Sequence, residues 1–395
     1  MAFSTHGIHR YVTELTHLGG TKRNRKPVLY PPILVFVFQH SSSLSYQTMP
    51  DQKALLLEKK QGSLIVGTRP IPKPGPGQLL VKVRAAGLNP VDWKIQEYGI
   101  FVPEEGYPVV LGTDIAGDVV EVGEGVDQAH WPKGTRVLVG SYGLSDRAGF
   151  QQYTLIAADM AAKVPSNLSY SQAASISVAF VCAAYGIYAE EPIGGTLNPK
   201  WDPNVKYTGQ HALVIGGSTS VGQYAIQILR KILGFTTVIA YASAQHEEHL
   251  KSLGATHVLD RHSVPAGKLF SAVRTITGEV PLKFVFDTLG GDEIRDIGYS
   301  LLGEGGQCCS VDPRVETKKE NGKRQFGVLG IVHYPSHRPA GLHLMRNLEK
   351  WVADGLILPN RIYELPTGLE KIVEGLAIVK GNKAGGAKVI GHPED

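Results

Sequence analysis

The chain has 395 residues, of which 43% are hydrophobic and 19% are charged, a composition typical of a globular protein long enough for two domains. Its formal net charge is only +4, and no run of Lys and Arg with interleaved aromatic residues indicates a nucleic-acid-binding surface. Small-molecule chemistry is the expected function class. The three cysteines, Cys182, Cys308 and Cys309, cannot form a disulfide framework or a C-x-x-C metal cluster, so we expect a reducing compartment and buried thiols.

The first 48 residues differ in character from the rest of the chain. They combine a basic polar stretch, the short apolar run ILVFVF at 33–38 and the polar run SSSLSYQT. The apolar run is too short to span a bilayer and lies behind a long polar stretch, unlike a secretory signal, so no membrane partner is expected. We interpret residues 1–48 as an N-terminal extension, disordered or produced by an upstream misread start, with Met49 as the functional beginning. Few acids and several basic residues leave a mitochondrial presequence as the alternative to a cytoplasmic location.

Residues 51–165 are rich in Gly, Pro and Val and contain alternating apolar and polar segments. This pattern predicts a small twisted all-β domain, with strands at 78–88, 114–123 and 135–140. Residues 171–189 follow as an Ala-rich, mostly apolar helix, with Pro192 shortly after it. This helix is predicted to join two domains.

Beyond this helix, apolar strands alternate with helical patterns, the strands being expected at 212–217, 236–243, 256–260, 283–290 and 306–312. Such alternation with continuous apolar strands implies a parallel sheet covered on both faces, and hence an α/β fold class. After Gly341 come two amphipathic helical stretches and a short closing strand, AKVIG, which we expect to pack back on the first domain.

The most informative stretch is HALVIGGSTSVGQ at 211–223, which runs from an apolar strand through a glycine-bearing turn into a helix that starts near Ser220. Three glycines, Gly216, Gly217 and Gly222, allow the backbone to turn sharply and approach a pyrophosphate, whose charge is favoured by the free amides at the helix start. The motif departs from G-x-G-x-x-G, and a strand-to-helix turn packed by glycines is the alternative. The flanking strand and helix favour a dinucleotide site.

The end of the second strand of this unit indicates which cofactor is bound. Sites that prefer NAD generally carry Asp or Glu about 20 residues after the glycine turn, to bind the ribose hydroxyls. Here TTVIAYAS ends in Ala242 and Ser243, so no carboxylate would repel a 2′-phosphate. Ser243 can donate to such a phosphate, and His246 or Lys251 can add positive charge, although Lys251 is equally explained as a solvated helix residue. We therefore predict NADPH as the cofactor.

The order of these parts carries a family resemblance. Together with AAGLNPVDWK at 85–94, LGTDIAGDVVEVGEGV at 111–126, GTRV at 134–137 and ADGLILP at 353–359, it resembles the medium-chain dehydrogenase/reductase superfamily from Met49 to the end of the chain. Within that superfamily the chain looks like the zinc-free quinone oxidoreductases and enoyl reductases, especially fungal GroES-like trans-acting enoyl reductases. The resemblance implies a GroES-like catalytic domain over 49–180, completed by 341–395, and a Rossmann domain with a doubly wound parallel sheet over 181–340.

Zinc-dependent members of the superfamily place a Cys after a strand of the first module and a His-Glu pair in a G-H-E motif, because thiolate and imidazole suit tetrahedral zinc. In this chain residues 89–92 replace the segment with the Cys, and Gly112-Thr113-Asp114 replaces the G-H-E motif. Because the Cys and His ligands are missing at these positions, we predict no metal. Without a Lewis acid, alcohol oxidation is disfavoured. Reduction of an activated C=C bond or a quinone remains, in which hydride reaches the β-carbon, an enolate-like oxyanion develops and a hydroxyl or water supplies a proton.

The resemblance also suggests catalytic residues on the loop near the expected active site. Tyr98 and Lys94 are candidate proton donors, and their alternatives are a packing or surface tyrosine and a solvated lysine. Asn89 precedes Pro90 as a turn-former, and its amide is a candidate contact for the nicotinamide end. Thr113 and Asp114 are expected to shape the cleft rather than to do chemistry.

For the cofactor, backbone groups of Thr288 and Leu289 are expected to bridge ribose and nicotinamide, and the segment FGVLGIVH at 326–333 is expected to be a further apolar strand. The predicted cofactor-binding residues are Gly216, Gly217, Ser218, Thr219, Ser220, Val221, Gly222, Ser243, His246, Lys251, Thr288 and Leu289.

Two functions remain open at this stage. The first is an NADPH-dependent enoyl or quinone reductase, with a role in secondary metabolism and with a polyketide synthase carrier protein as a candidate partner. The second is an NADPH-binding protein with little or no catalysis. The chain is expected to be a monomer or a homodimer, and its substrate is not named by the sequence.

Overall fold

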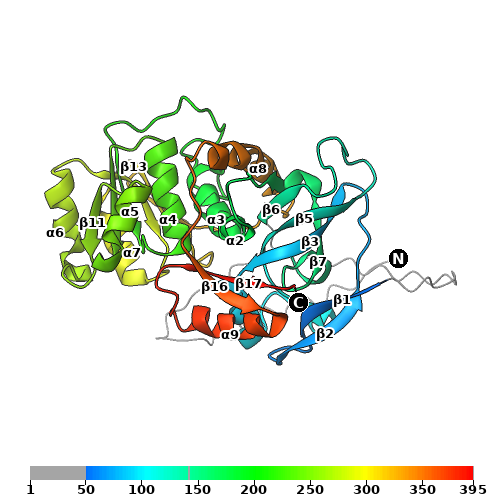
Figure 1. Ribbon diagram of the computed structural model, residues 1–395. Helices are drawn as coiled ribbons and strands as arrows, with labels where there is room; N and C mark the ends of the chain where they lie inside the picture. Colours follow the sequence, from blue (N-terminus) through cyan, green and yellow to red (C-terminus); the bar gives the residue numbers. More distant parts are fainter. Residues whose placement is uncertain (1–49, 141–142, 395) are drawn as a thin grey trace, which may run out of the picture. The chain divides into compact units, whose positions relative to one another are not determined.

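The structure, a computed structural model, describes residues 50–140 and 143–394 (Figure 1). The expected N-terminal extension over 1–48 lies outside the described residues. The β-rich part has a three-stranded sheet in the order β2-β1-β4 and a larger sheet in the order β16-β17-β3-β5-β6-β8, with β7 paired to β3. The first eight strands of the chain belong to this β-rich part. They are β1 Asp51–Leu57, β2 Leu64–Pro70, β3 Gln78–Gly87, β4 Val109–Val110, β5 Asp114–Val122, β6 Arg136–Gly140, β7 Tyr153–Ala157 and β8 Ala161–Lys163.

Strand β3 is the centre of the larger sheet, because it pairs antiparallel with β5, β7 and β17 (Lys388–His392). Apolar side chains such as Leu79, Val81 and Val83 are fully buried along it. At its carboxyl end the chain enters helix α1, Pro90–Tyr98, which begins with proline at its first position and ends at Gly99 in the left-handed conformation. Both are favoured residue choices at helix ends.

The second sheet has the order β11-β10-β9-β12-β13-β15-β14. All neighbouring pairs are parallel except β14 with β15, so the first six strands follow the 3-2-1-4-5-6 order of a Rossmann sheet. Its strands are β9 His211–Ile215, β10 Thr237–Ala242, β11 His257–Asp260, β12 Leu282–Asp287, β13 Leu302–Ser310, β14 Lys318–Glu320 and β15 Lys323–Gly327. Its connecting helices are α4 Ser220–Gln227, α5 Glu247–Leu253, α6 Ala266–Thr277 and α7 Asp292–Ser300.

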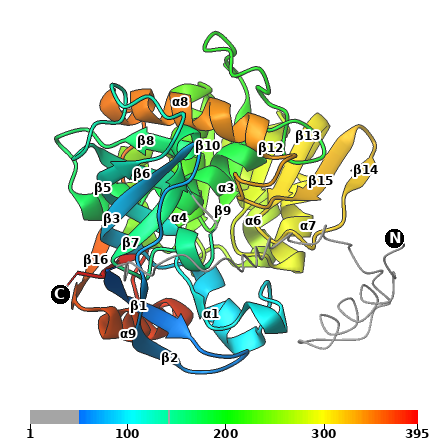
Figure 2. The same ribbon diagram turned by 90° about the vertical axis from the view of Figure 1, so that its right-hand side faces the viewer.

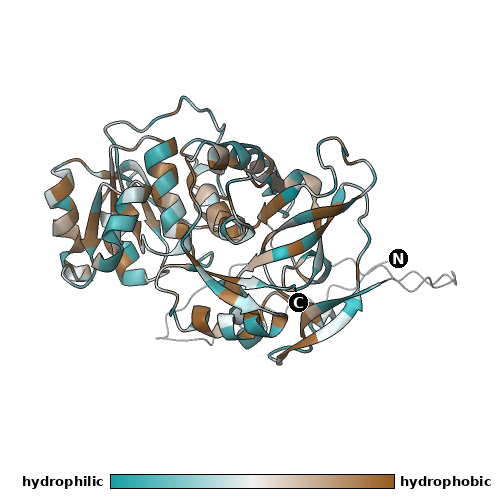
Figure 3. Cartoon of the chain, viewed as in Figure 1, coloured by the Kyte–Doolittle hydropathy of each residue, from teal (hydrophilic) through white to brown (hydrophobic). Residues whose placement is uncertain are grey.

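Helices cover both faces of this sheet. One hydrophobic cluster joins α4 and α5 to one face, and another joins α6 and α7 to the other. In Figure 3 the strands are largely brown, whereas the helices alternate teal and brown, as expected for strands buried between two layers. The predicted α/β fold class with a doubly wound parallel sheet is confirmed.

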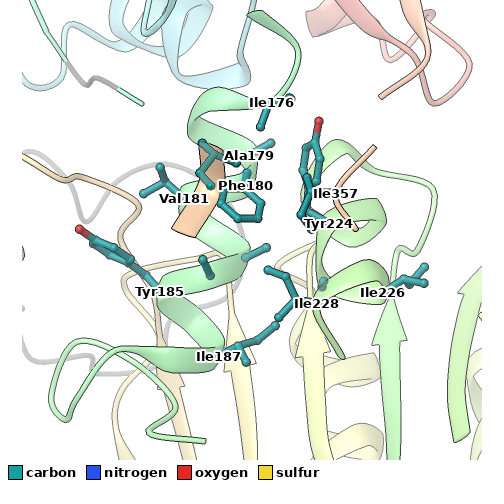
Figure 4. Packing of buried hydrophobic residues seen from close by; sticks show 14 of the residues in the cluster. Ile176, Ala179, Phe180, Val181, Tyr185, Ile187, Tyr224, Ile226, Ile228 and Ile357 are labelled. Carbon is teal, nitrogen blue, oxygen red and sulfur yellow. The ribbon is translucent and has the colours of Figure 1, made fainter. Parts of the chain in front are cut away.

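The expected single helix at 171–189 is two helices, α2 Tyr170–Ala174 and α3 Ser177–Tyr188. The hydroxyl of Ser175 donates to the carbonyl of Gln172 at 2.7 Å, and such local bonds compete with the helical pattern at the break. Residues 170–188 are long and apolar enough to cross a membrane by composition, but 78% of that stretch is buried inside the protein. Figure 4 shows Phe180 of α3 against Tyr224 of α4, with ring centroids 5.7 Å apart, so the apolarity belongs to a core helix.

Residues 338–392 return to the β-rich part. They form α8 Arg338–Ala353, β16 Ile362–Thr367, α9 Leu369–Lys380 and β17. Strand β17 pairs with β3 and with β16, and Figure 2 shows α9 beside α1 and β2. The expected packing of this return on the first module is therefore observed.

The strand expected over 326–333 is largely wrong. Only Phe326 and Gly327 belong to β15. The amide of Val328 still pairs with Ser310, but the amide of Ile331 then bonds to the carbonyl of Leu329, two residues back. A turn this tight ends the extended backbone that a strand requires.

Candidate active site

The glycine turn after β9 is the predicted phosphate cradle. Gly216 has φ +76, in the left-handed region that favours glycine, and a Cβ there would overlap the Thr288 hydroxyl. A Cβ on Gly217 would lie 2.9 Å from that of Ala240, and one on Gly222 would overlap the carbonyl of Gly216. Each glycine therefore allows a close approach that no other residue allows.

Helix α4 begins at Ser220, as the sequence predicts, because Thr219 caps it. The Thr219 hydroxyl accepts from the amide of Gly222 at 3.0 Å and donates to the Thr288 hydroxyl at 2.9 Å. The amides of Ser220 and Val221 precede the first intrahelical bond, and the positive end of the helix dipole lies there. These groups fit the charge and size of a pyrophosphate.

The loop after β12 touches the same turn. Thr288 is 9% exposed, and its amide donates to the carbonyl of Ile215 at 3.0 Å. The amide of Leu289 donates to Asp287 at 3.0 Å, whereas the Leu289 side chain is 55% exposed. Both backbone amides already donate to protein acceptors. The contacts with ribose and nicotinamide that the sequence predicts for Thr288 and Leu289 would therefore be made by their carbonyl groups.

A cationic group lies at the tip of β10, beside the predicted Ser243. Arg261 donates through Nε to the Ser243 hydroxyl at 2.8 Å, and Arg361 lies 3.0 Å from His246 Nδ1. Burial, together with Arg361 and Arg261, lowers the pKa of His246, so this ring accepts the arginine bond as a neutral group. The positive charge expected from His246 is therefore supplied by the two arginines.

Lys251 forms an ion pair with Glu247, one turn earlier on α5, with an N–O distance of 2.7 Å. Both side chains are about half exposed, which agrees with the alternative of a solvated helix lysine. Its contact with a phosphate stays a prediction.

Arg261 and Arg361 were not among the residues predicted from the sequence. Arg261 directly follows β11, the strand next to β10, so its place at the carboxyl edge could have been inferred from the parallel order. Arg361 comes from the loop before β16, more than a hundred residues along the chain, and nothing near the glycine motif indicates it.

The C-terminal return also touches the glycine turn. Gln223, fully buried in α4, donates to the carbonyls of Ser218 and Gly386 at 2.9 and 2.8 Å. A Cβ on Gly386 would lie 3.1 Å from the Ser218 carbonyl and 3.2 Å from the His246 ring. The loop that leads into β17 is therefore held against the start of the cradle.

A second group of polar residues is buried where β3, β5, β17 and α3 meet. The Asn89 amide nitrogen donates to Thr113 Oγ1 and to Asp114 Oδ2, each at 2.8 Å. Asn89 Oδ1 accepts from the Lys388 ammonium at 2.6 Å, and that ammonium lies 2.5 Å from Asp114 Oδ2. We call Asn89, Asp92, Thr113, Asp114 and Lys388 the buried polar cluster; each is at most 7% exposed.

Asn89 is fully engaged inside this cluster. Both its amide nitrogen and its oxygen have side-chain partners, and its backbone amide donates to Asp92 Oδ2 at 2.7 Å. This favours a structural role for Asn89 inside the cluster, and its predicted contact with nicotinamide stays a prediction.

Asp92 lies at the third position of α1 and is completely buried. Burial raises the pKa of this carboxyl to about 7, and the neighbouring Asp114 acts in the same direction. The backbone amides of Asn89 and Gly112 and the Lys388 ammonium oppose the shift. The cluster therefore contains a carboxyl that holds a proton near neutral pH.

The two predicted proton donors lie further along α1. Tyr98 is 37% exposed, and its ring packs edge-on against Trp93 with centroids 5.8 Å apart. Lys94 is exposed, with its ammonium 5.7 Å from the centre of the same ring. These contacts join both to Trp93 rather than to the buried polar cluster, and their part in proton transfer stays a prediction.

The residues present fit a dinucleotide but not a zinc ion. The helix start and the arginines supply the amides and charge that a dinucleotide phosphate requires, and the glycines let the turn pack closely against its neighbours. In the buried polar cluster the Asn89 oxygen and the Asp114 carboxylate contact the Lys388 ammonium, whose positive charge repels a metal cation. Within 50–140 and 143–394, no three His, Cys, Asp or Glu residues are grouped to hold a metal.

Comparisons with known proteins identify the family of this chain. Residues 75–166 match the family model of the alcohol dehydrogenase GroES-like domain, and residues 220–325 match that of the zinc-binding dehydrogenases. The chain is 32% identical over 310 residues to a dehydrogenase, pigH, of Monascus ruber, with 76% of each chain covered. The chain belongs to the medium-chain dehydrogenase/reductase superfamily. The resemblance stated from the sequence is confirmed.

Other members of the superfamily are also similar. The chain is 37% identical over 230 residues to the trans-enoyl reductase tndF of Aspergillus flavipes, covering 57% of this chain and 64% of that relative. A solved structure of mycobacterial Rv1454c complexed with NADPH has the same fold, with a TM-score of 0.66 and 22% identity over 87% of this chain and all of that one. Membership places the chain among oxidoreductases that use a nicotinamide cofactor.

Proposed function

We propose that this protein is a zinc-independent, NADPH-dependent reductase of an activated C=C bond in an enoyl or enone substrate, or of a quinone. The observation that carries the proposal is the pair of arginines at the tip of β10, combined with a cluster whose cation is a lysine. When bound, NADPH supplies a hydride to the electron-poor acceptor. The protein's own residues bind the cofactor, form the cleft and deliver a proton.

The preference for NADPH rests on charge. Arg261 and Arg361 converge on Ser243 and His246, where a ribose 2′-phosphate would lie if the cofactor follows the usual path over the glycine turn. Arginine suits this task because its planar guanidinium donates two bonds to one phosphate. Ser243 stands where NAD sites usually carry an acidic residue on this strand.

Zinc independence rests on donor chemistry. Asn89 and Thr113 are weak zinc ligands, and Asp114 already has the Lys388 ammonium at 2.5 Å. A substrate oxyanion in this cleft would therefore be stabilised by hydrogen-bond donors rather than by a Lewis acid. This favours reduction of an activated alkene or a quinone over alcohol oxidation.

Proton delivery is assigned to the exposed residues of α1. Tyr98 and Lys94 are retained as the proposed donors, because each is accessible to solvent and carries a transferable proton. Asn89 is retained as a group of the cleft wall. The variants Tyr98→Phe and Lys94→Met distinguish the two candidate donors. Only loss of the true donor should lower kcat strongly and remove the corresponding limb of the pH profile of kcat.

Substrate presentation, assembly and location are part of the same proposal. Similarity to trans-enoyl reductases supports an enoyl thioester, which a polyketide synthase carrier protein could present. We propose a monomer or homodimer that acts in the cytoplasm. Size-exclusion chromatography with light scattering and tagging of the full chain in cells test these points.

One experiment tests cofactor and reaction together. Purified protein is titrated with NADPH and NADH by fluorescence and then assayed by absorbance with enones, enoyl thioesters and quinones. Replacement of Arg361 by Met should weaken NADPH binding about tenfold or more, the scale of one charged hydrogen bond, and leave NADH binding unchanged. Arg346→Met, an exposed change on α8, is the matched control.

Three results would count against the proposal. Equal affinity for both cofactors in the unaltered protein would remove the NADPH preference. Binding without turnover of any substrate class would favour a cofactor-binding protein with little catalysis. Stoichiometric zinc by elemental analysis would end the zinc-independent mechanism.

A further inference from the structure

Lys388 is a buried lysine whose ammonium contacts other buried side chains of the protein. Its side chain is 4% exposed, and its ammonium contacts Asp114 Oδ2 at 2.5 Å and Asn89 Oδ1 at 2.6 Å. Lysines are almost never fully buried unless they are paired. The position therefore serves a specific interaction and not general solubility.

The contacts of this ammonium reach several distant segments. Asn89 begins α1, and Asp114 begins β5. The other oxygen of Asp114, Oδ1, accepts from the amide of Val178 at 2.7 Å, in the first turn of α3. One cation on β17 thus fixes the start of α1, the start of β5 and the start of the helix that leads to the nucleotide-binding part.

The space around the ammonium is closed by the backbone. A Cβ on Gly87 would lie 2.9 Å from both Lys388 Cε and Asp114 Cβ, and 2.8 Å from the carbonyl of Ala174. Glycine at this position therefore lets β3 pass close to the ion pair. The pairing of Gly87 with Ile390 sets the register of β17 and so the place of the lysine.

The charges of the cluster make the lysine indispensable to its arrangement. Two carboxyl groups, Asp92 and Asp114, and one ammonium, Lys388, are buried together. Removing one partner of a buried ion pair leaves an uncompensated charge, which is far more costly than removing both. The side chains that Lys388 contacts would then turn or take up water.

We propose that Lys388 is a positioning residue of the active site, the internal cation that sets Asn89 and Asp114 and, through Asp114, the first turn of α3. The proposal rests on the proposed function for its effect on turnover. Lys388 does not reach the reacting atoms and acts through the residues it holds. It keeps the starts of α1 and β5 in register with the start of α3 before substrate arrives.

The test compares full-length variants. Lys388→Met removes the charge and keeps a long side chain. Asp114→Asn removes the partner, and Asp114→Asn with Lys388→Met removes the pair together. Lys371→Met, on the exposed side of α9 where Lys371 pairs with Glu374, is the matched control.

Three quantities are measured at a temperature at which every variant is folded. They are the Kd for NADPH by fluorescence titration, kcat for the best substrate of the panel, and the exchange rate of the Val178 amide by hydrogen exchange. For Lys388→Met we expect kcat to fall at least tenfold while the Kd for NADPH changes less than threefold. The Val178 amide should exchange at least tenfold faster, and Asp114→Asn should show the same acceleration.

The outcomes are distinct. If Lys388→Met matches Lys371→Met in both kcat and Val178 exchange, the proposal is overturned. If Lys388→Met does not fold, the paired variant decides: low kcat supports the proposal and full kcat overturns it. If the unaltered protein shows no turnover, the proposed reaction fails and the Lys388→Met variant is judged by binding and exchange alone. An unchanged Kd for NADPH with faster exchange of the Val178 amide then supports the positioning role. Unchanged exchange of the Val178 amide overturns it.

Discussion

The buried carboxyl of Asp92 gives this protein a pH dependence of stability whose sign can be worked out. Its pKa is raised from the ordinary 3.8 to about 7, chiefly by burial. Between these two values the unfolded chain has released the proton while the folded protein still holds it. The contribution of Asp92 to stability is therefore complete below pH 4 and is lost as the pH rises through about 7.

The magnitude follows from the displacement of the pKa. Each tenfold change in proton affinity corresponds to about 1.36 kcal/mol, so the full effect is roughly 4 kcal/mol. Of this, roughly 2 to 3 kcal/mol falls between pH 5 and pH 8. Asp92→Asn removes the titration and keeps an oxygen that can accept from the Asn89 amide. The free energy of unfolding of the variant, relative to the unaltered protein, should rise by that amount across this interval.

Urea denaturation of both proteins at pH 5, 6, 7 and 8 measures the difference. Glu105→Gln, at an exposed carboxyl in the short helical turn after α1, is the control and should give a flat difference across the series. The charged groups that face Asp92 are Asp114 and Lys388, and both are present in every variant. A difference between Asp92→Asn and the unaltered protein that stays constant with pH would refute the reasoning.

Further changes address the glycine turn, the helix cap and the thiols. Gly216→Ala should lower NADPH affinity at least tenfold in titration, because the new Cβ would overlap the residues behind the turn, whereas Gly209→Ala, also at positive φ but in open space, should leave affinity unchanged. Thr219→Val should lower the free energy of unfolding by about 1 kcal/mol in urea denaturation, and Thr219→Ser should restore it. Cys182 is only partly buried, whereas Cys308 and Cys309 are fully buried and burial raises the pKa of both thiols well above the ordinary range, so iodoacetamide at pH 8 should leave Cys308 and Cys309 unmodified in the native protein by mass spectrometry.

The parts of the fold that depend on residues close together in the sequence could be predicted from it. The run into Gly216 and the start of α4 at Ser220 depend on neighbouring residues, and both were found where expected. The break at Ser175 was missed because its cause, a hydroxyl bonding to its own turn, is only one option among several for a serine in an apolar run. The end of β15 at Gly327 was missed because the following residues remain apolar after leaving the sheet.

The site could be predicted only where its residues are close in sequence. Ser243 follows its strand directly, and the absence of an acid there is visible to any reader of the chain. Arg361 reaches the same place from a loop whose sequence, LPNRIYEL, has no feature of a phosphate site. Lys388 was likewise indistinguishable from an ordinary strand lysine, since its burial depends on the pairing of β17 with β3.

Residues 360–388 connect the two halves of the candidate site. Arg361 lies beside His246 at the tip of β10, and the carbonyl of Gly386 accepts from Gln223 at the start of the phosphate cradle. Two residues after Gly386, Lys388 enters the buried polar cluster. Because only Ala387 separates Gly386 from Lys388, the loop held against the glycine turn and the buried ammonium belong to one short segment. The loop contact of the glycine turn and the arrangement of the buried polar cluster therefore depend on the same segment of the chain.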